Sequence, residues 1–137
     1  MMNWTVVLSL LGVAAFGMAT VETAHAQERV FELRTYHCFP GRLDALHKRF
    51  REHTNAIFVK HGMSLIGYWT PTEGEGAGNT LVYMLAYPSK AAREASWKAF
   101  RDDPDWQTAR AESEKDGKIV EKVDSVFLSP TDYSPIH

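Results

Sequence analysis

The order of its periodic segments constrains the fold of this chain more than any other feature. Four segments are predicted to be strands, at residues 27–37, 63–70, 80–87 and 119–128. Two segments follow helical spacing, at residues 42–60 and 89–102. The order strand-helix-strand-strand-helix-strand contains two βαβ units. It predicts an α+β fold of the split β-α-β-β-α-β, ferredoxin-like type.

Capping and stop residues divide these segments. Gly62 is a natural stop for the first helix, and Ser89 can cap the second. Asp103 and Pro104 are typical of a new helix start, so the second helix is predicted to be broken in two. Residues 71–79 are rich in glycine and acidic residues, and we expect a mobile loop there.

The first 26 residues resemble a leader rather than part of the domain. Residues 4–21 carry no charge, and Ala24, His25 and Ala26 form a small-x-small cleavage pattern. We expect a signal peptide at residues 1–26, cleaved after Ala26, and a periplasmic or secreted protein without stable membrane insertion. The alternative is an uncleaved membrane anchor, because an apolar run of about 18 residues can just span a bilayer.

Composition limits the partners of the remaining domain, residues 27–137. It contains all 15 basic residues and, since Glu22 is the only acidic residue before it, 16 of the 17 acidic ones. Without an excess or stripe of positive charge, nucleic acid is not an expected partner. Cys38 is the single cysteine, so it cannot form an intrachain disulfide; a free thiol and an intermolecular bridge both stay open.

Several short motifs together resemble the NIPSNAP family over nearly all of the predicted mature chain. They are FELRTY at residues 31–36, Pro40-Gly41, HGM at 61–63, GYW at 67–69 and WKAFRDDPDW at 97–106. The resemblance implies a homodimer in which two sheets face each other and close an α/β barrel. The eukaryotic relatives are mitochondrial and implicated in vesicle or organelle-clearance signalling, a role that the leader argues against here. The wider barrel superfamily includes cofactor-independent monooxygenases, haem-degrading oxygenases and dye-decolorising peroxidases.

Three polar residues share one face of the first predicted strand. Glu32, Arg34 and Tyr36 alternate with Phe31 and Leu33, which we expect to meet the helices, so the polar residues are expected to face the dimer barrel. Glu32 and Arg34 are close enough along a strand to pair. They are interpreted either as a structural ion pair or, with Tyr36, as ligand-binding residues: Arg34 for an acidic group, Tyr36 as a hydrogen-bond donor.

His53 is the other candidate for chemistry. It falls on the apolar stripe of the first predicted helix with Leu46, Phe50 and Ile57, where an imidazole needs a hydrogen-bond partner. One interpretation is a core histidine. The other is a general base, or an axial ligand to haem held between helix and sheet.

The remaining candidates carry weaker signals. Trp69 lies near the predicted loop and could stack on a flat ligand as well as pack in an interface. His37 and Cys38 are adjacent, but two ligands without a third do not predict a metal site. The sequence contains no phosphate-binding glycine motif, nucleophile elbow or zinc-type spacing.

The sequence therefore predicts an exported homodimer that binds a small molecule or a partner in or beside its barrel, with no cofactor required. The alternative is an oxygenase-like enzyme, cofactor-independent or haem-dependent, that uses the barrel cavity with His53 or Tyr36 as its catalytic residue.

Overall fold

The computed structural model describes residues 29–137, so the predicted leader lies outside the described residues. The elements in chain order are β1 (Val30–Cys38), α1 (Leu43–Arg49), the π-helix η1 (Phe50–Thr54), α2 (Asn55–Lys60), β2 (Ser64–Trp69), β3 (Thr80–Tyr87), α3 (Lys90–Asp102), α4 (Pro104–Ser113) and β4 (Val120–Leu128). Within this part of the chain the strands form one antiparallel sheet in the order β2-β3-β1-β4. The predicted α+β architecture is confirmed.

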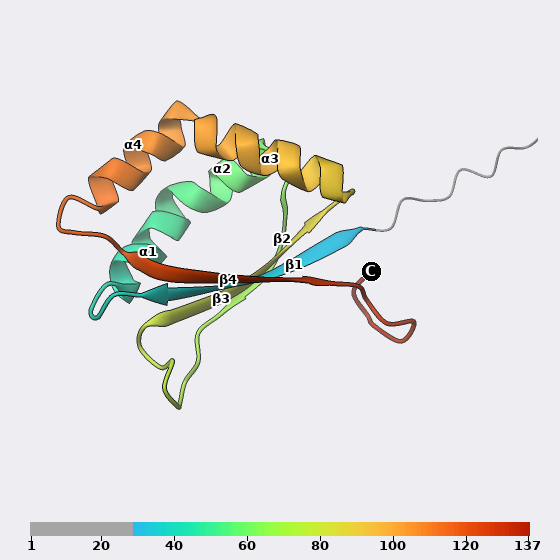
Figure 1. The fold of residues 1–137 in the computed structure, drawn as a ribbon, viewed down its shortest axis with the longest axis horizontal. Coiled ribbons are helices and arrows are strands. Elements are labelled where there is room, and N and C mark those ends of the chain that lie inside the picture. Colours follow the sequence, from blue (N-terminus) through green and yellow to red (C-terminus); the bar gives the residue numbers. More distant parts are fainter. Residues whose placement is uncertain (1–28) are drawn as a thin grey trace, which may run out of the picture.

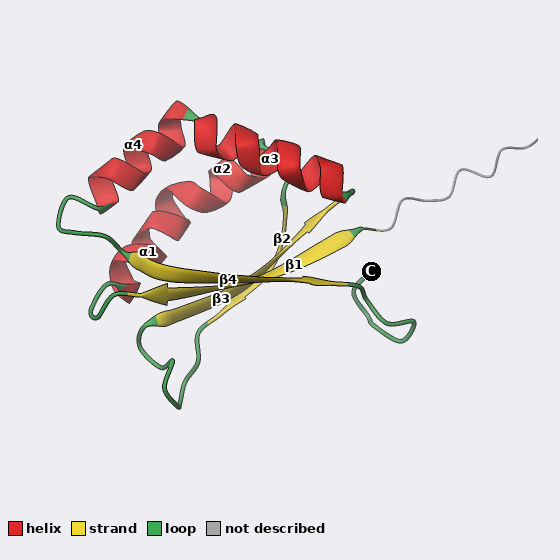
Figure 2. Cartoon of the chain, viewed as in Figure 1, coloured by secondary structure: helices red, strands yellow, loops and turns green. Residues whose placement is uncertain are grey.

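All helices lie on one side of the sheet, and the other side is not covered by a helix (Figures 1 and 2). Strand register places Leu33 of β1 opposite Met84 of β3 and Val126 of β4. Val82 lies two residues before Met84 on β3 and therefore on the same face. Trp69 of β2 pairs with Val82 and shares this face. We call this helix-free surface, marked by these five residues, the open face. Trp69 and Val126 are each 54% exposed on it.

The first predicted helix is one run of helix with a π-helical turn in its middle. The wider turn changes which residues point inward, because it adds a residue to the repeat. Leu46, Phe50, Thr54 and Phe58 are buried at successive steps of four, with exposures of 5% or less. His53 is instead exposed, so its predicted place on the apolar stripe is wrong.

The predicted break in the second helix is confirmed. The Ser89 side chain accepts a hydrogen bond from the first turn of α3, and Asp103 caps α4 with Pro104 at its first position. The Asp103 carboxylate also accepts from Lys60 and His61, each at 2.7 Å. These contacts join the end of α2 to the α3–α4 junction and hold the helices as one layer over the sheet.

The core fills the space between the sheet and the helices and is mainly aromatic. Tyr83 and Phe58 are fully buried at its centre, with ring centroids 6.1 Å apart, and Trp97 and Phe100 pack on Phe58 from α3. Among residues 29–137, no helix is long and apolar enough to cross a membrane.

The C-terminal tail, residues 129–137, folds back beside the start of β1 (Figure 1). Pro130 and Ile136 of the tail line a pocket with Phe31, which is only 3% exposed although it lies on the open face. The Arg29 guanidinium donates to the backbone oxygen of His137. Phe31 was predicted to contact the helices. It lies beside the C-terminal tail instead.

Candidate functional site

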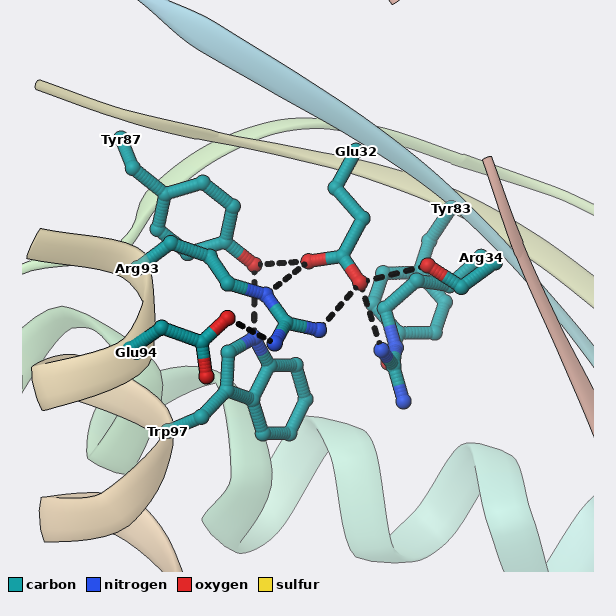
Figure 3. A network of polar contacts seen from close by, with 8 residues as sticks. Glu32, Arg34, Tyr83, Tyr87, Arg93, Glu94 and Trp97 are labelled. Carbon is teal, nitrogen blue, oxygen red and sulfur yellow. Dashed lines mark hydrogen bonds and ion pairs between the residues drawn. The ribbon is translucent and has the colours of Figure 1, made fainter. Parts of the chain in front are cut away.

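Glu32 is the centre of a buried polar network between the sheet and α3 (Figure 3). Its carboxylate is inaccessible to solvent and accepts hydrogen bonds from Tyr87 at 2.7 Å and Ser125 at 2.6 Å. Arg93 of α3 donates to both carboxylate oxygens, at 2.7 and 3.1 Å. Arg34 supplies a further bond at 2.7 Å. The predicted pairing of Glu32 with Arg34 is confirmed, and the pair is one part of a larger cluster.

Arg34 connects this network to the aromatic core. Its Nε donates to the Tyr83 hydroxyl at 3.0 Å, and its guanidinium carbon lies 4.3 Å from the ring centroid of Trp97. The Trp97 indole N–H donates in turn to the hydroxyl of Tyr87 at 2.8 Å. Each polar group of the cluster is thus held by another, as burial of charged groups requires.

The network lies on the helix side of the sheet, so the predicted orientation of Glu32, Arg34 and Tyr36 toward a barrel is wrong. Alternation along β1 correctly separates these residues from Phe31 and Leu33 but does not say which set meets the helices. The helix layer provides Arg93 as a counter-charge for Glu32, which makes burial of the polar set possible. The apolar set lies on the open face.

The electrostatics of the network favour a structural role. Burial alone would raise the pKa of the Glu32 carboxyl, but the hydrogen bonds that it accepts, first of all from Arg93, lower the pKa to about 2. Burial raises the pKa of the Tyr87 hydroxyl, which therefore stays protonated and donates. A permanently ionised, fully bonded carboxylate has no free lone pair for a proton-transfer role. Glu32 and Arg93 hold α3 on the sheet.

Beside the network lies a cavity of about 280 Å³ between β1, β4 and the helices. We call it the aromatic cavity, because five aromatic side chains line it: Tyr36, Phe50, Phe58, Phe100 and Trp106. Tyr36 packs edge-on against Phe50 and Tyr83, with ring centroids 6.1 and 5.1 Å away. The Arg34 guanidinium carbon lies 5.6 Å from the Tyr36 ring, so Tyr36 joins the polar network to the cavity.

Arg49 is the buried one among six charged residues that line this cavity; the others are Arg110, Glu114, Lys118, Glu121 and Lys122. It is only 4% exposed, and its guanidinium carbon lies 5.1 Å from the ring centroid of Trp106. Glu114 is its carboxylate partner at 3.3 Å, and Ser113 accepts a bond at 3.2 Å. Among the described residues its Nε atom has no hydrogen-bond partner. Burial lowers the pKa of Arg49, against the opposing effect of Glu114.

Neither the aromatic cavity nor His53 fits a haem. The side chain of His53 is 49% exposed, 3.9 Å from Glu52, and lines two pockets shared with Ala109 and Glu112 of α4 rather than the aromatic cavity. No histidine, cysteine or methionine is among the described residues that line the cavity, so of the usual axial ligands only a tyrosine, Tyr36, is present. The position of His53 does not support its predicted role as a ligand to haem held between helix and sheet; its general-base role stays a prediction.

Trp69 lies on the open face, on the opposite side of the sheet from the other three predicted ligand residues. Its indole lies over Gly67, where a Cβ atom would be only 2.5 Å from the Trp69 ring. The structure therefore brings Glu32, Arg34 and Tyr36 together and leaves Trp69 apart, among the residues that line a separate cavity at β2.

His37 and Cys38 also point away from each other. His37 pairs with Asp124 at 2.8 Å, whereas Cys38 is a buried free thiol whose pKa is raised by burial. Within residues 29–137 no group of three or more histidine, cysteine, aspartate or glutamate side chains could hold a metal ion. The buried thiol is not placed for an intermolecular bridge.

Sequence reasoning did not find Arg49, Arg93 or Tyr83. The spacing of Arg93 and Trp97, four residues apart on α3, was a usable signal, because it places a cation and an aromatic ring on one helix face. Arg49 carried no such signal, since an arginine at the end of a helical turn is usually solvated.

The antiparallel sheet of order β2-β3-β1-β4, with helices on one side, defines an α+β domain of the ferredoxin-like class. The family model for NIPSNAP matches residues 31–135, and the chain belongs to the NIPSNAP family. A search of curated proteins found no significant match.

Solved structures of NIPSNAP proteins are similar to this chain. A NIPSNAP family protein of Agrobacterium tumefaciens is 25% identical with a TM-score of 0.70, over 80% of this chain and 100% of that chain. An uncharacterised NIPSNAP domain protein of Burkholderia xenovorans is 27% identical with a TM-score of 0.65, over 77% of this chain and 98% of that chain. A Chloroflexus aurantiacus protein whose description proposes an antibiotic biosynthesis monooxygenase shares the fold, at 15% identity and a TM-score of 0.51, over 80% of this chain and 100% of that chain.

Proposed function

We propose that this protein binds a small aromatic molecule with an anionic group in the aromatic cavity. The observation that carries the proposal is Arg49, a buried guanidinium that is incompletely bonded and lines a cavity together with five aromatic rings. A buried cation that lacks full pairing is costly, and an anionic ligand would remove that cost. The rings of Tyr36 and Trp106 offer surfaces for an aromatic group. The volume of about 280 Å³ suits a molecule with a single ring.

Exchange of Arg49 for methionine should separate binding from stability. We expect Arg49→Met to weaken binding of cinnamate or phenylacetate at least tenfold, measured by isothermal titration calorimetry. The free energy of unfolding should change by no more than about 1 kcal/mol, because the variant loses an underpaired buried charge. Glu114 keeps Arg110 as a partner at 3.6 Å.

Arg101→Met is the matched control, because Arg101 is exposed and does not line the cavity. It should bind these acids like the wild type. Equal affinities of the Arg49 and Arg101 variants for both acids would contradict the proposed site.

We also propose that two copies of the chain associate through the open face and close a barrel. Support comes from the apolar surface that Leu33, Met84 and Val126 present on a sheet side without helices. A sheet with helices on one side needs a cover for the other.

Light scattering should give twice the chain mass at micromolar concentration. Val126→Asp should shift the protein to monomer, because it places a charge in the apolar interface. Val59→Asp is the control: Val59 is 58% exposed on α2, similar to the 54% of Val126, but lies on the helix side. A wild-type monomer, or equal masses for the two variants, would contradict the interface.

The pattern of residues 1–26 supports export as part of the same proposal: a periplasmic or secreted protein. The alternative function is an oxygenase that acts on the bound aromatic molecule. The fold shared with the Chloroflexus protein and the aromatic lining of the cavity favour this alternative. Consumption of dissolved oxygen on addition of a bound acid would select the oxygenase, and binding without oxygen consumption would select the binding protein.

A further inference from the structure

A second cavity lies on the helix side of the sheet, at the edge strand β2. It measures about 450 Å³ and is bounded by the π-helical turn on one side and by Tyr68 and Leu81 on the other. We call it the edge cleft. It shares only Phe50 with the described lining of the aromatic cavity. The two cavities therefore have almost entirely separate linings, and the edge cleft can be tested on its own.

The edge cleft contains two buried polar atoms that lack partners. Among residues 29–137, neither the Tyr68 hydroxyl nor the Asn55 side-chain oxygen has a hydrogen-bond partner. Both residues line the cleft. Buried polar groups are nearly always bonded, so two unbonded groups at one cavity indicate a bound molecule that supplies the bonds. Asn55 directly follows the π-helical turn, and such turns are frequent at functional sites.

The chemistry of the two atoms is complementary. Burial raises the pKa of the Tyr68 hydroxyl, so at neutral pH it is a donor, whereas the Asn55 oxygen is an acceptor. A ligand hydroxyl can accept from the first and donate to the second.

The surroundings narrow the ligand further. The Tyr68 ring stacks on Tyr83, with centroids 5.5 Å apart, and meets Phe50 edge-on at 5.7 Å, which forms an aromatic wall. Arg51 also lines the cleft; it is exposed, and among the described residues no ion pair joins it to a carboxylate. These three features suit a molecule with an aromatic ring, a hydroxyl group and a negative charge.

We propose that the edge cleft binds a small phenol that carries a carboxylate, a hydroxybenzoate. Its ring packs beside Tyr68 and Phe50, its hydroxyl bonds to Tyr68 and Asn55, and its carboxylate pairs with Arg51. This site is independent of the aromatic cavity and of the residue that carries the function proposed there.

The test uses the full chain with Arg49→Met, so that the aromatic cavity does not contribute to binding. Para-hydroxybenzoate and benzoate are titrated by calorimetry with and without Tyr68→Phe. We expect para-hydroxybenzoate to bind about tenfold more tightly than benzoate, a ratio typical of one net hydrogen bond. Tyr68→Phe should reduce this preference, because only the bond to Asn55 remains, and leave the affinity for benzoate unchanged.

One control and two further tests complete the experiment. Tyr133→Phe, at a side chain that is 84% exposed, should retain the preference for the hydroxyl. Arg51→Ala should weaken both ligands by a similar factor. Amide chemical shifts in nuclear magnetic resonance should move at Asn55 and Tyr68 on addition of para-hydroxybenzoate. Equal affinity for the two ligands before the Tyr68 exchange, or a preference that the exchange leaves undiminished, would overturn the proposal.

Discussion

Replacement of Glu32 by leucine should lower the free energy of unfolding by about 3–5 kcal/mol, the usual cost of removing one member of a buried charge cluster. The variant leaves Arg34 and Arg93 facing each other without the carboxylate that both now bind. It also leaves Tyr87 and Ser125 without an acceptor. Urea unfolding monitored by circular dichroism measures the loss.

Variants at the two arginines separate charge from shape. Arg34→Met should cost less, about 1–3 kcal/mol, because Arg93 still donates to both oxygens of Glu32. Combining Glu32→Leu with Arg34→Met leaves Arg93 with only the exposed Glu94 as a partner, at 3.0 Å, and should stay destabilised. Adding Arg93→Met should recover much of the stability, since a buried cluster replaced by apolar side chains is often neutral. A Glu32→Leu protein with wild-type stability would refute the role of the network.

The dependence of stability on pH tests the same carboxylate. The folded-state pKa of Glu32, about 2, lies below its ordinary value of 4.5. The ionised group therefore stabilises the fold above pH 4.5, and this contribution is lost as the pH falls from there toward 2. This difference between the two pKa values of Glu32 corresponds to about 3 kcal/mol in the free energy of unfolding. Glu32→Leu should flatten this part of the stability curve.

Phe58→Ala should have a comparable effect, a loss of about 3–5 kcal/mol, because the cavity left behind cannot collapse. Phe58 is fully buried and contacts Tyr83, Trp97 and Phe100 on both sides of the core. Tyr133→Ala is the control at an aromatic side chain that is 84% exposed, and it should stay within about 0.5 kcal/mol of the wild type. Thermal and urea unfolding of both variants measure these losses. Equal stability of the Phe58 and Tyr133 variants would show that the core does not depend on Phe58.

Local signals predicted the elements well. The bounds of β3 were predicted to the residue, and the caps at Ser89 and Asp103 stand where the sequence placed them. These features depend on side chains that act on their own turn of backbone, so a single sequence contains the whole cause. The β-α-β-β-α-β order then followed.

The faces of the elements were predicted less well, because their causes lie far away in sequence. Glu32 turns toward the helices because Arg93, 61 residues later, neutralises it there. His53 turns outward because the π-helical turn inserts a residue before it, and the buried Thr54 hydroxyl donates to the backbone oxygen of Arg49. A regular period of 3.6 cannot represent such an insertion. The lining of the aromatic cavity depends on both features: the orientation of β1 toward the helices and the π-helical turn. It could not be predicted without them.

The contact between Gly67 and Trp69 limits how the edge strand can vary. Any side chain at position 67 would collide with the indole, although the backbone there needs no left-handed conformation. Substitution of Gly67 would therefore displace the indole from the strand rather than strain the chain. Positions 67 and 69 should change together among related sequences, glycine persisting wherever a large ring covers it and larger residues entering only where that ring is lost.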